Sequence, residues 1–193
     1  MRRRLSRAYT VVELMMSLAV FATGVTGIIA MQRATVSSNT MAKNLTIANG
    51  IAQTWLTRLD ADSSLWRNNV SETVWLKSVD VTSMNNVWQL PAYDTALGFG
   101  PRFDALGNPV QTGGEFCAQI RLKWLFRDNN GGGIRGNGVI RTEVRVFWPR
   151  NGQNRVANDC SSGSTSTVAA VSAATNAYHF VVQASAVRQP GLQ

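Results

Sequence analysis

The sequence predicts an α+β protein in which one long N-terminal helix packs on an antiparallel sheet. Two patterns support this fold class. An apolar run near the N-terminus continues into an amphipathic helical pattern, and three segments nearer the C-terminus alternate apolar with polar residues. Strands that follow a long helix are typical of a helix laid on a sheet. The length of 193 residues suits one anchor and one modest globular domain.

The N-terminus combines a basic leader, residues 1–8, with an apolar span. Glu13 is the only charged residue in the 23-residue run from Tyr9 to Met31. At about 1.5 Å per residue, this run can cross about 30 Å of hydrocarbon. A carboxylate costs about 2.5–3.5 kcal/mol in such a span, so an intramembrane acid indicates a functional site. Four leader arginines supply half of the formal net charge of +8 and predict a cytoplasmic leader with the C-terminal domain outside.

The helical pattern continues beyond the apolar span. Apolar residues at spacings of three and four form a stripe along one face: Met41, Leu45, Ala48, Ala52, Trp55, Leu56 and Leu59. One helix of about 50 residues is therefore expected, membrane-spanning over 9–31 and amphipathic over 32–60. Gly24 and Gly27 are points where this helix could bend or unwind. Residues 61–193 are expected to form the globular domain.

Residues 60–115 carry weaker signals. The stretch 60–64 either ends the helix or begins a second short one, and 70–81 has β-branched residues without clean alternation. Glycine and proline recur between Pro91 and Gly114, which predicts irregular structure there.

Three strands are expected in the C-terminal part. The first two, 116–127 and 139–148, alternate apolar and polar residues and form a hairpin with a long loop. In the first strand, the apolar face is Ala118, Ile120, Leu122, Trp124 and Phe126. The third strand, 178–187, has Tyr178, Phe180 and Val182 on one face and His179 on the other, where it is expected to face solvent. The stretch 161–167 is expected to be a surface loop.

Cys117 and Cys160 are the only cysteines. In an exported domain an even pair predicts one disulfide, which closes a loop of roughly 40 residues and contributes about 2–4 kcal/mol. Two buried free thiols are the alternative. His179 is the only histidine and the chain has no CxxC, so neither a metal site nor a cofactor is expected.

Few residues suggest chemistry. The stretch 131–136 fits GxGxxG, but a strand follows it where the dinucleotide fingerprint needs a helix, so a flexible hairpin tip is expected instead. No arrangement of nucleophile, acid and base indicates an enzyme. A basic strand face could contact DNA, an anionic surface or an acidic partner, with a solvated face as the alternative. Its residues are Arg121, Lys123, Arg127, Arg141 and Arg145, with Trp75, Trp88 and Phe147 expected nearby.

The segment from Arg7 to Leu14, RAYTVVEL, resembles the class III signal of type IV prepilins and pseudopilins. Ala8 replaces the usual Gly of that family and Tyr9 its usual Phe. The resemblance implies that a prepilin peptidase cuts between Ala8 and Tyr9 and methylates the new amine of Tyr9. It also implies that Glu13 pairs with the N-terminal ammonium of a neighbouring subunit in a filament. An ordinary secretory signal peptide cut after Ala22, or an uncleaved anchor, is the competing interpretation.

The stretches 24–32, 38–39 and 48–53 are similar to PilV-type minor pilins, which implies a type IV pilin-like fold. The implied function is a minor pilin without enzymatic activity that primes pilus assembly and sits at or near the pilus tip. The implied partners are other minor pilins, the major pilin, the inner-membrane assembly platform, the prepilin peptidase and a tip adhesin. The implied location is the inner membrane, with a periplasmic domain, and then the pilus on the cell surface. Three alternatives remain: a minor pseudopilin of a type II secretion system, a DNA-uptake or adhesive pilin, and an exported hydrolase.

Overall fold

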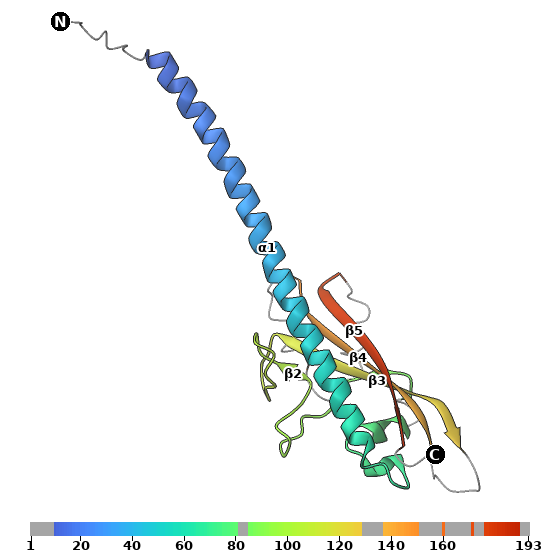
Figure 1. Ribbon diagram of the computed structural model, residues 1–193. Coiled ribbons are helices and arrows are strands. Elements are labelled where there is room, and N and C mark those ends of the chain that lie inside the picture. Colours follow the sequence, from blue (N-terminus) through green and yellow to red (C-terminus); the bar gives the residue numbers. More distant parts are fainter. Residues whose placement is uncertain are drawn as a thin grey trace, which may run out of the picture. The chain divides into compact units, whose positions relative to one another are not determined.

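The computed structural model describes residues 10–80, 85–128, 137–150, 160, 171 and 176–189. It contains one long helix, two short 3-10 helices and one antiparallel sheet (Figure 1), which confirms the predicted α+β class. This architecture is compatible with a pilin-like fold. The elements are α1 (Val11–Ser63), η1 (Val70–Glu72), η2 (Leu76–Asp80), β1 (Trp88–Gln89), β2 (Arg102–Phe103), β3 (Phe116–Asp128), β4 (Asn137–Pro149) and β5 (Tyr178–Arg188). The chain divides into two compact units, up to Asn44 and from Leu45 onward, which are described separately.

The first unit is the N-terminal part of α1. Thr10 precedes the helix, and its Oγ1 accepts a hydrogen bond of 3.3 Å from the backbone N–H of Glu13. The helix is long and apolar enough to cross a membrane, and none of its apolar window is buried, which is consistent with a membrane anchor. Gly24 and Gly27 are helical, and a side chain at either position would meet open space.

The second unit begins with the amphipathic part of α1. Its buried apolar residues are Ala48, Ile51, Ala52, Trp55 and Leu59, which recur at spacings of three and four. The helix ends at Ser63, three residues beyond the predicted end at residue 60. The Ser63 hydroxyl donates to the carbonyl of Asp60 at 2.6 Å, and the chain then leaves the helix through a tighter turn.

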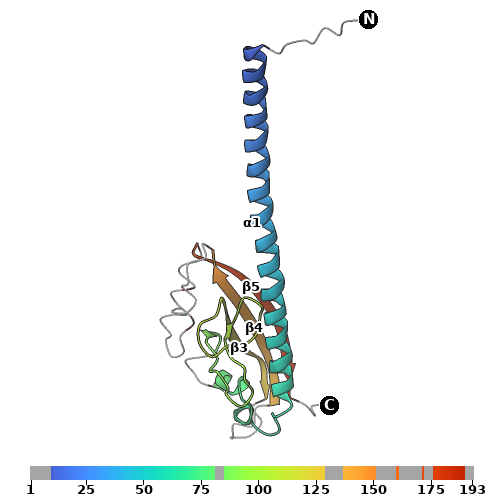
Figure 2. The ribbon, with the colours of Figure 1, turned by 90° about the vertical axis from the view of Figure 1, so that its left-hand side faces the viewer.

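The sheet of the second unit has the strand order β1-β3-β4-β5, with β2 paired to β3. Figure 2 shows its three long strands, β3, β4 and β5. The predicted hairpin is confirmed, because β3 and β4 pair antiparallel along their length. The amphipathic part of α1 covers one face, here called the inner face, where Gln183 of β5 donates to Asn49 of α1 at 3.0 Å. The opposite face is called the outer face. The buried inner residues of the two long strands include Ala118, Ile120, Leu122, Ile140, Val144, Val146 and Trp148.

The region with weaker signals, 60–115, contains η1, η2, β1 and β2, of which only β2 lies in the stretch predicted to be irregular. Aromatic side chains hold it against α1: the ring of Trp55 lies 5.6 Å from Trp75 and 4.7 Å from Phe99, and Phe99 lies 5.6 Å from Phe103. These side chains are almost fully buried. Aromatic packing of this kind contributes both area burial and edge-to-face contacts.

A register shift between Trp124 and Phe126 overturns the predicted face of two residues. Phe126 was expected inside the sheet, but it is 61% exposed. Arg127 was expected on the basic outer face, but it lies over the ring of Trp124 and pairs with Asp80 at 3.1 Å. The physical reason is a β-bulge, which adds a residue to one strand and exchanges the faces beyond it.

The last strand is confirmed, but its faces differ from the prediction. His179 was expected to face solvent, yet it is half-buried on the inner face, 5.5 Å from the ring of Trp148. Tyr178 is buried on the outer face, whereas Phe180 and Val182 are 51% and 47% exposed on that face. The outer face therefore carries apolar residues of its own.

The predicted disulfide is present between Cys117 and Cys160, so the alternative of two free thiols is wrong. Both cysteines are fully buried in a small cluster with Phe147, Val171 and Tyr178. This cluster gives the outer face a second core. The predicted hairpin tip at 131–136 and surface loop at 161–167 lie outside the described residues.

Candidate functional site

The first candidate site is the start of α1. Glu13 lies in the first turn of the helix, where exposed backbone N–H groups favour a negative charge. Within the described part of the chain, no basic side chain pairs with its carboxylate. The expected cleavage and methylation positions, Ala8 and Tyr9, lie outside the described residues.

The second candidate site is the outer face of the sheet. Of the five basic residues expected there, the structure brings together Arg121, Lys123, Arg141 and Arg145, because they alternate along β3 and β4. Arg127 is separated from them by the bulge. The other expected neighbours also divide: Trp88 lies on this face, Phe147 belongs to the disulfide cluster, and Trp75 packs against α1.

Glu143 organises the arginines of the outer face. Its side chain is 5% exposed and sits between two guanidinium groups. Arg121 donates to one carboxylate oxygen of Glu143, and Arg141 pairs with the other at 2.5 Å. Charge-assisted hydrogen bonds to a buried carboxylate fix the geometry of both side chains. Removing Glu143 would leave two cations facing each other.

Trp88 and Gln119 hold the remaining arginine. The guanidinium carbons of Arg121 and Arg145 lie 4.7 and 4.6 Å from the Trp88 ring centroid. Arg145 also donates from Nε to the Gln119 side-chain oxygen at 3.1 Å. Burial, and then the positive charge of Arg121, lower the pKa of Arg145 to about 10. Arg145 therefore stays protonated at neutral pH.

Two residues that order this face, Glu143 and Gln119, were not among those expected from the sequence. Glu143 does carry a signal, because an acid among alternating arginines indicates a cross-strand ion pair. Gln119 gave no such signal, because a polar residue in an alternating strand is also typical of a solvent-exposed position. Trp88 was expected near this face, and its contacts with Arg121 and Arg145 confirm that expectation. The tryptophan reaches the arginines because β1 pairs with β3, with Trp88 opposite Arg121.

The chemistry available at these sites is charge pairing and stacking. The described residues contain no group of three or more His, Cys, Asp or Glu side chains that could hold a metal ion. Comparison of the chain with protein-family models, curated proteins and solved structures gave no match.

Proposed function

We propose that the chain is a minor pilin, a structural subunit that helps to start the assembly of a type IV pilus. The observation that carries this proposal is Glu13, an acid in the first turn of a helix whose apolar window is fully exposed. A charged side chain at that position is costly in a membrane, so an acid there indicates a functional role. In the proposed function that role is the recruitment of the subunit into a filament.

The proposed role of Glu13 is to pair with an N-terminal ammonium. Cleavage before Tyr9 would create an ammonium four residues earlier, about 6 Å along a helix. In a filament the apolar helices pack together, and a free ammonium there would be unpaired in a medium of low dielectric constant. The carboxylate of one subunit and the ammonium of its neighbour would satisfy each other, which sets the axial register between them.

The two halves of α1 support this proposal. The apolar window of the first unit has no buried residue, whereas the second unit buries only one stripe of the helix. A helix that is apolar on all sides requires a membrane or a bundle of similar helices around it. The same segment would thus serve as the anchor before assembly and as the filament core afterwards.

The finer proposal is a PilV-type minor pilin at or near the pilus tip. Similarity in the stretches 24–32, 38–39 and 48–53 supports it, together with a disulfide-stabilised domain that suits an oxidising compartment. The proposed partners are the other minor pilins, the major pilin and the inner-membrane assembly platform. The proposed role needs no catalysis.

Substitution of Glu13 tests the proposal. Glu13→Gln and Glu13→Ala should leave the amount of membrane protein unchanged but remove the subunit from sheared pili, because the neutral side chains cannot pair with an ammonium. Glu13→Asp is the matched control, which keeps the charge and should retain part of the incorporation. Wild-type incorporation of the Gln variant would refute the proposal.

N-terminal sequencing of the membrane-purified protein gives an independent test. A mature chain that begins at Tyr9 with a methylated amine is expected. A chain that begins at Thr23 would show an ordinary secretory signal peptide and would exclude a pilin. The genes next to this one separate a pilus subunit from a secretion-system pseudopilin.

A further inference from the structure

The last strand, β5, lies at one edge of the described sheet. It is 11 residues long and pairs with β4 on one side, and no other strand among the described residues pairs with it (Figure 1). Long edge strands are usually protected by a lysine, a proline, a bulge or a covering segment. From Tyr178 to Val187 the strand has no proline, lysine, arginine or carboxylate. Its sequence therefore contains none of the residues that usually prevent edge-to-edge pairing.

The hydrogen-bond pattern identifies which residues face the open edge. Gln189 donates to the carbonyl of Gly138, and Arg150 donates to the carbonyl of Ala177. Both are directly opposite pairs in the β4–β5 register, so the odd-numbered residues of β5 bond to β4. The even-numbered residues therefore direct their N–H and C=O groups to the open edge. These residues are Phe180, Val182, Ala184 and Ala186.

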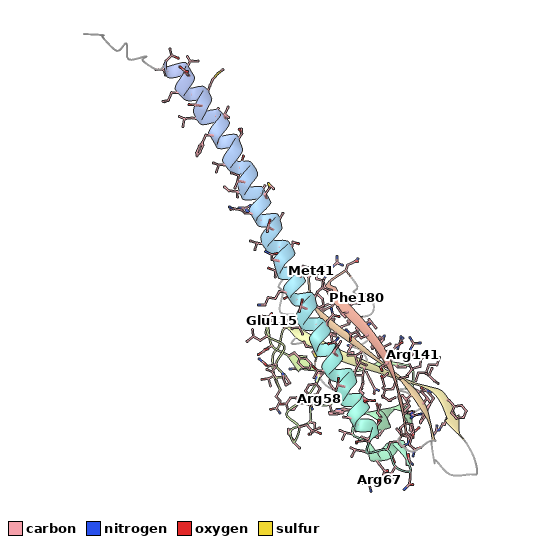
Figure 3. The ribbon with its side chains drawn as sticks, viewed as in Figure 1. Met41, Arg58, Arg67, Glu115, Arg141 and Phe180 are labelled. Carbon is pink, nitrogen blue, oxygen red and sulfur yellow. A yellow bond between two sulfur atoms is a disulfide. The ribbon has the colours of Figure 1, made fainter. Side chains whose placement is uncertain are left out.

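The same even-numbered residues form the outer face of β5, and they divide it into two parts. Phe180 and Val182 are 51% and 47% exposed and give an apolar part. Figure 3 labels Phe180 on β5 and Arg141 on the neighbouring β4. Ala184 and Ala186 are small, and Ala186 lies directly opposite Arg141, whose side chain is 51% exposed. A side chain on an added strand could reach the Arg141 guanidinium across these alanines.

The charge of the outer face selects an acidic partner. Between Cys117 and Lys123 of β3 and along the facing parts of β4 and β5, Glu143 is the only acid on the outer face, against several cations: Arg121, Lys123, Arg141, Arg145 and Arg188. A strand with carboxylates beside Ala184 and Ala186 would meet this excess of positive charge. A nucleic acid is less suited, because its phosphates can accept from backbone N–H groups but cannot donate to the C=O groups that alternate with them along the edge, whereas an extended peptide pairs with both.

We propose that the open edge of β5 binds an extended acidic segment of another protein as an added antiparallel strand. Its carboxylates lie beside Ala184 and Ala186, and its apolar side chains lie beside Val182 and Phe180. Antiparallel addition continues the pattern of the existing sheet. Backbone hydrogen bonds supply the affinity, and the two-part outer face supplies the specificity. This interaction does not require Glu13 and is independent of the proposed filament assembly.

Residue-resolved amide exchange of the full chain in detergent micelles tests the proposal. The probe is the acetylated peptide ETETVTVT, whose outward residues match the two parts of the face, and KTKTVTVT is the charge-reversed control. In the free protein, the amides of Phe180, Val182, Ala184 and Ala186 should exchange faster than those of the odd-numbered residues between them. At about 1 mM, the acidic peptide should slow only these four amides, and it should bind about tenfold more tightly than the lysine peptide.

Two variants complete the test. Ala184→Pro removes an N–H that faces the edge and leaves the bonds to β4 intact, so it should weaken the acidic peptide about tenfold, whereas Ala184→Ser should not. Arg141→Gln should reduce the preference for the acidic peptide while protection of the four amides persists. The proposal is overturned if the four amides are already protected in the free chain, if neither peptide protects them, or if both do so equally. Binding of a DNA oligonucleotide without any amide protection would assign this face to nucleic acid instead.

Discussion

Asp62 joins the end of α1 to the segment that follows it. Its side chain is almost completely buried, and its two carboxylate oxygens accept three backbone hydrogen bonds. One oxygen accepts from Val74 at 2.8 Å, and the other accepts from Trp75 at 2.9 Å and Leu76 at 3.0 Å. We predict that this carboxylate is essential to the stability of the second unit, because it satisfies donors at the start of η2.

The size of the effect follows from the burial of the three donors. Trp75 and Leu76 are buried, whereas Val74 is half-buried and can reach water. A buried donor without a partner costs about 1–3 kcal/mol, so Asp62→Ala should cost about 2–6 kcal/mol. Asp62→Asn keeps one acceptor oxygen and should cost about 1–3 kcal/mol. The larger value is comparable to the whole stability of many domains, about 5–15 kcal/mol.

Urea unfolding of the full chain in mild detergent measures these costs. All six tryptophans lie between Trp55 and Trp148, so their fluorescence reports only on the second unit. Asp60→Asn is the matched control, because Asp60 is an exposed acid of the same helical turn and should change the stability by less than about 0.5 kcal/mol. If Asp62→Ala were as stable as this control with an unchanged slope, the reasoning would be refuted.

Three further predictions concern the sheet. Replacing Cys117 and Cys160 by alanine opens a loop with a sequence separation of 43 and should lower the free energy of unfolding by about 4 kcal/mol, measured by the same urea titration. Glu143→Gln should cost about 1–3 kcal/mol in that assay, because the arginines it separates are partly exposed and water screens part of their repulsion. His179 should titrate below its usual 6.5 in an NMR experiment, because burial and then Arg150 lower its pKa. Its contribution to stability is therefore complete above pH 6.5 and is lost as the pH falls through the lower folded value, and His179→Asn should remove that dependence.

The helix and the long strands could be predicted because each produces a regular spacing of apolar residues in the sequence. The stripe that includes Ala48, Ala52 and Trp55 fixed the buried face of α1, and alternation located β3, β4 and β5. The two cysteines, in a domain that was expected to be exported, predicted the disulfide. These features depend on spacing and composition, which are local properties of the chain.

The bulge in β3 leaves a weak signal in the alternation, because residues 124–126 are three apolar residues in succession. A second signal is Gly138 on the neighbouring strand. A Cβ at that position would lie 2.3 Å from the carbonyl oxygen of Phe126, so only glycine permits the close approach of the two backbones. A glycine at the start of an otherwise branched strand thus marks the point where Phe126 and Arg127 exchange faces.

The faces of β5 were uncertain for a different reason. Both faces of the sheet bury apolar residues, since α1 covers the inner face and the disulfide cluster covers one end of the outer face. The alternation of side chains along a strand then shows which residues share a face, but it does not show which of the two faces packs against α1. His179 was assigned to solvent because its neighbours Tyr178 and Phe180 are more apolar, yet contact with Trp148 decides its position.

The candidate sites differ in how they depend on the fold. The proposed role of Glu13 needs only a helix start and an apolar span, both of which are visible in the sequence. The outer face requires the register of three strands, which brings Arg121, Glu143 and Arg141 together. Substitutions at Asp62 should therefore disturb the outer face through unfolding, whereas substitutions at Glu13 should leave the unfolding free energy of the second unit unchanged. A loss of pilus incorporation by Glu13 variants with unchanged tryptophan unfolding would separate assembly from folding.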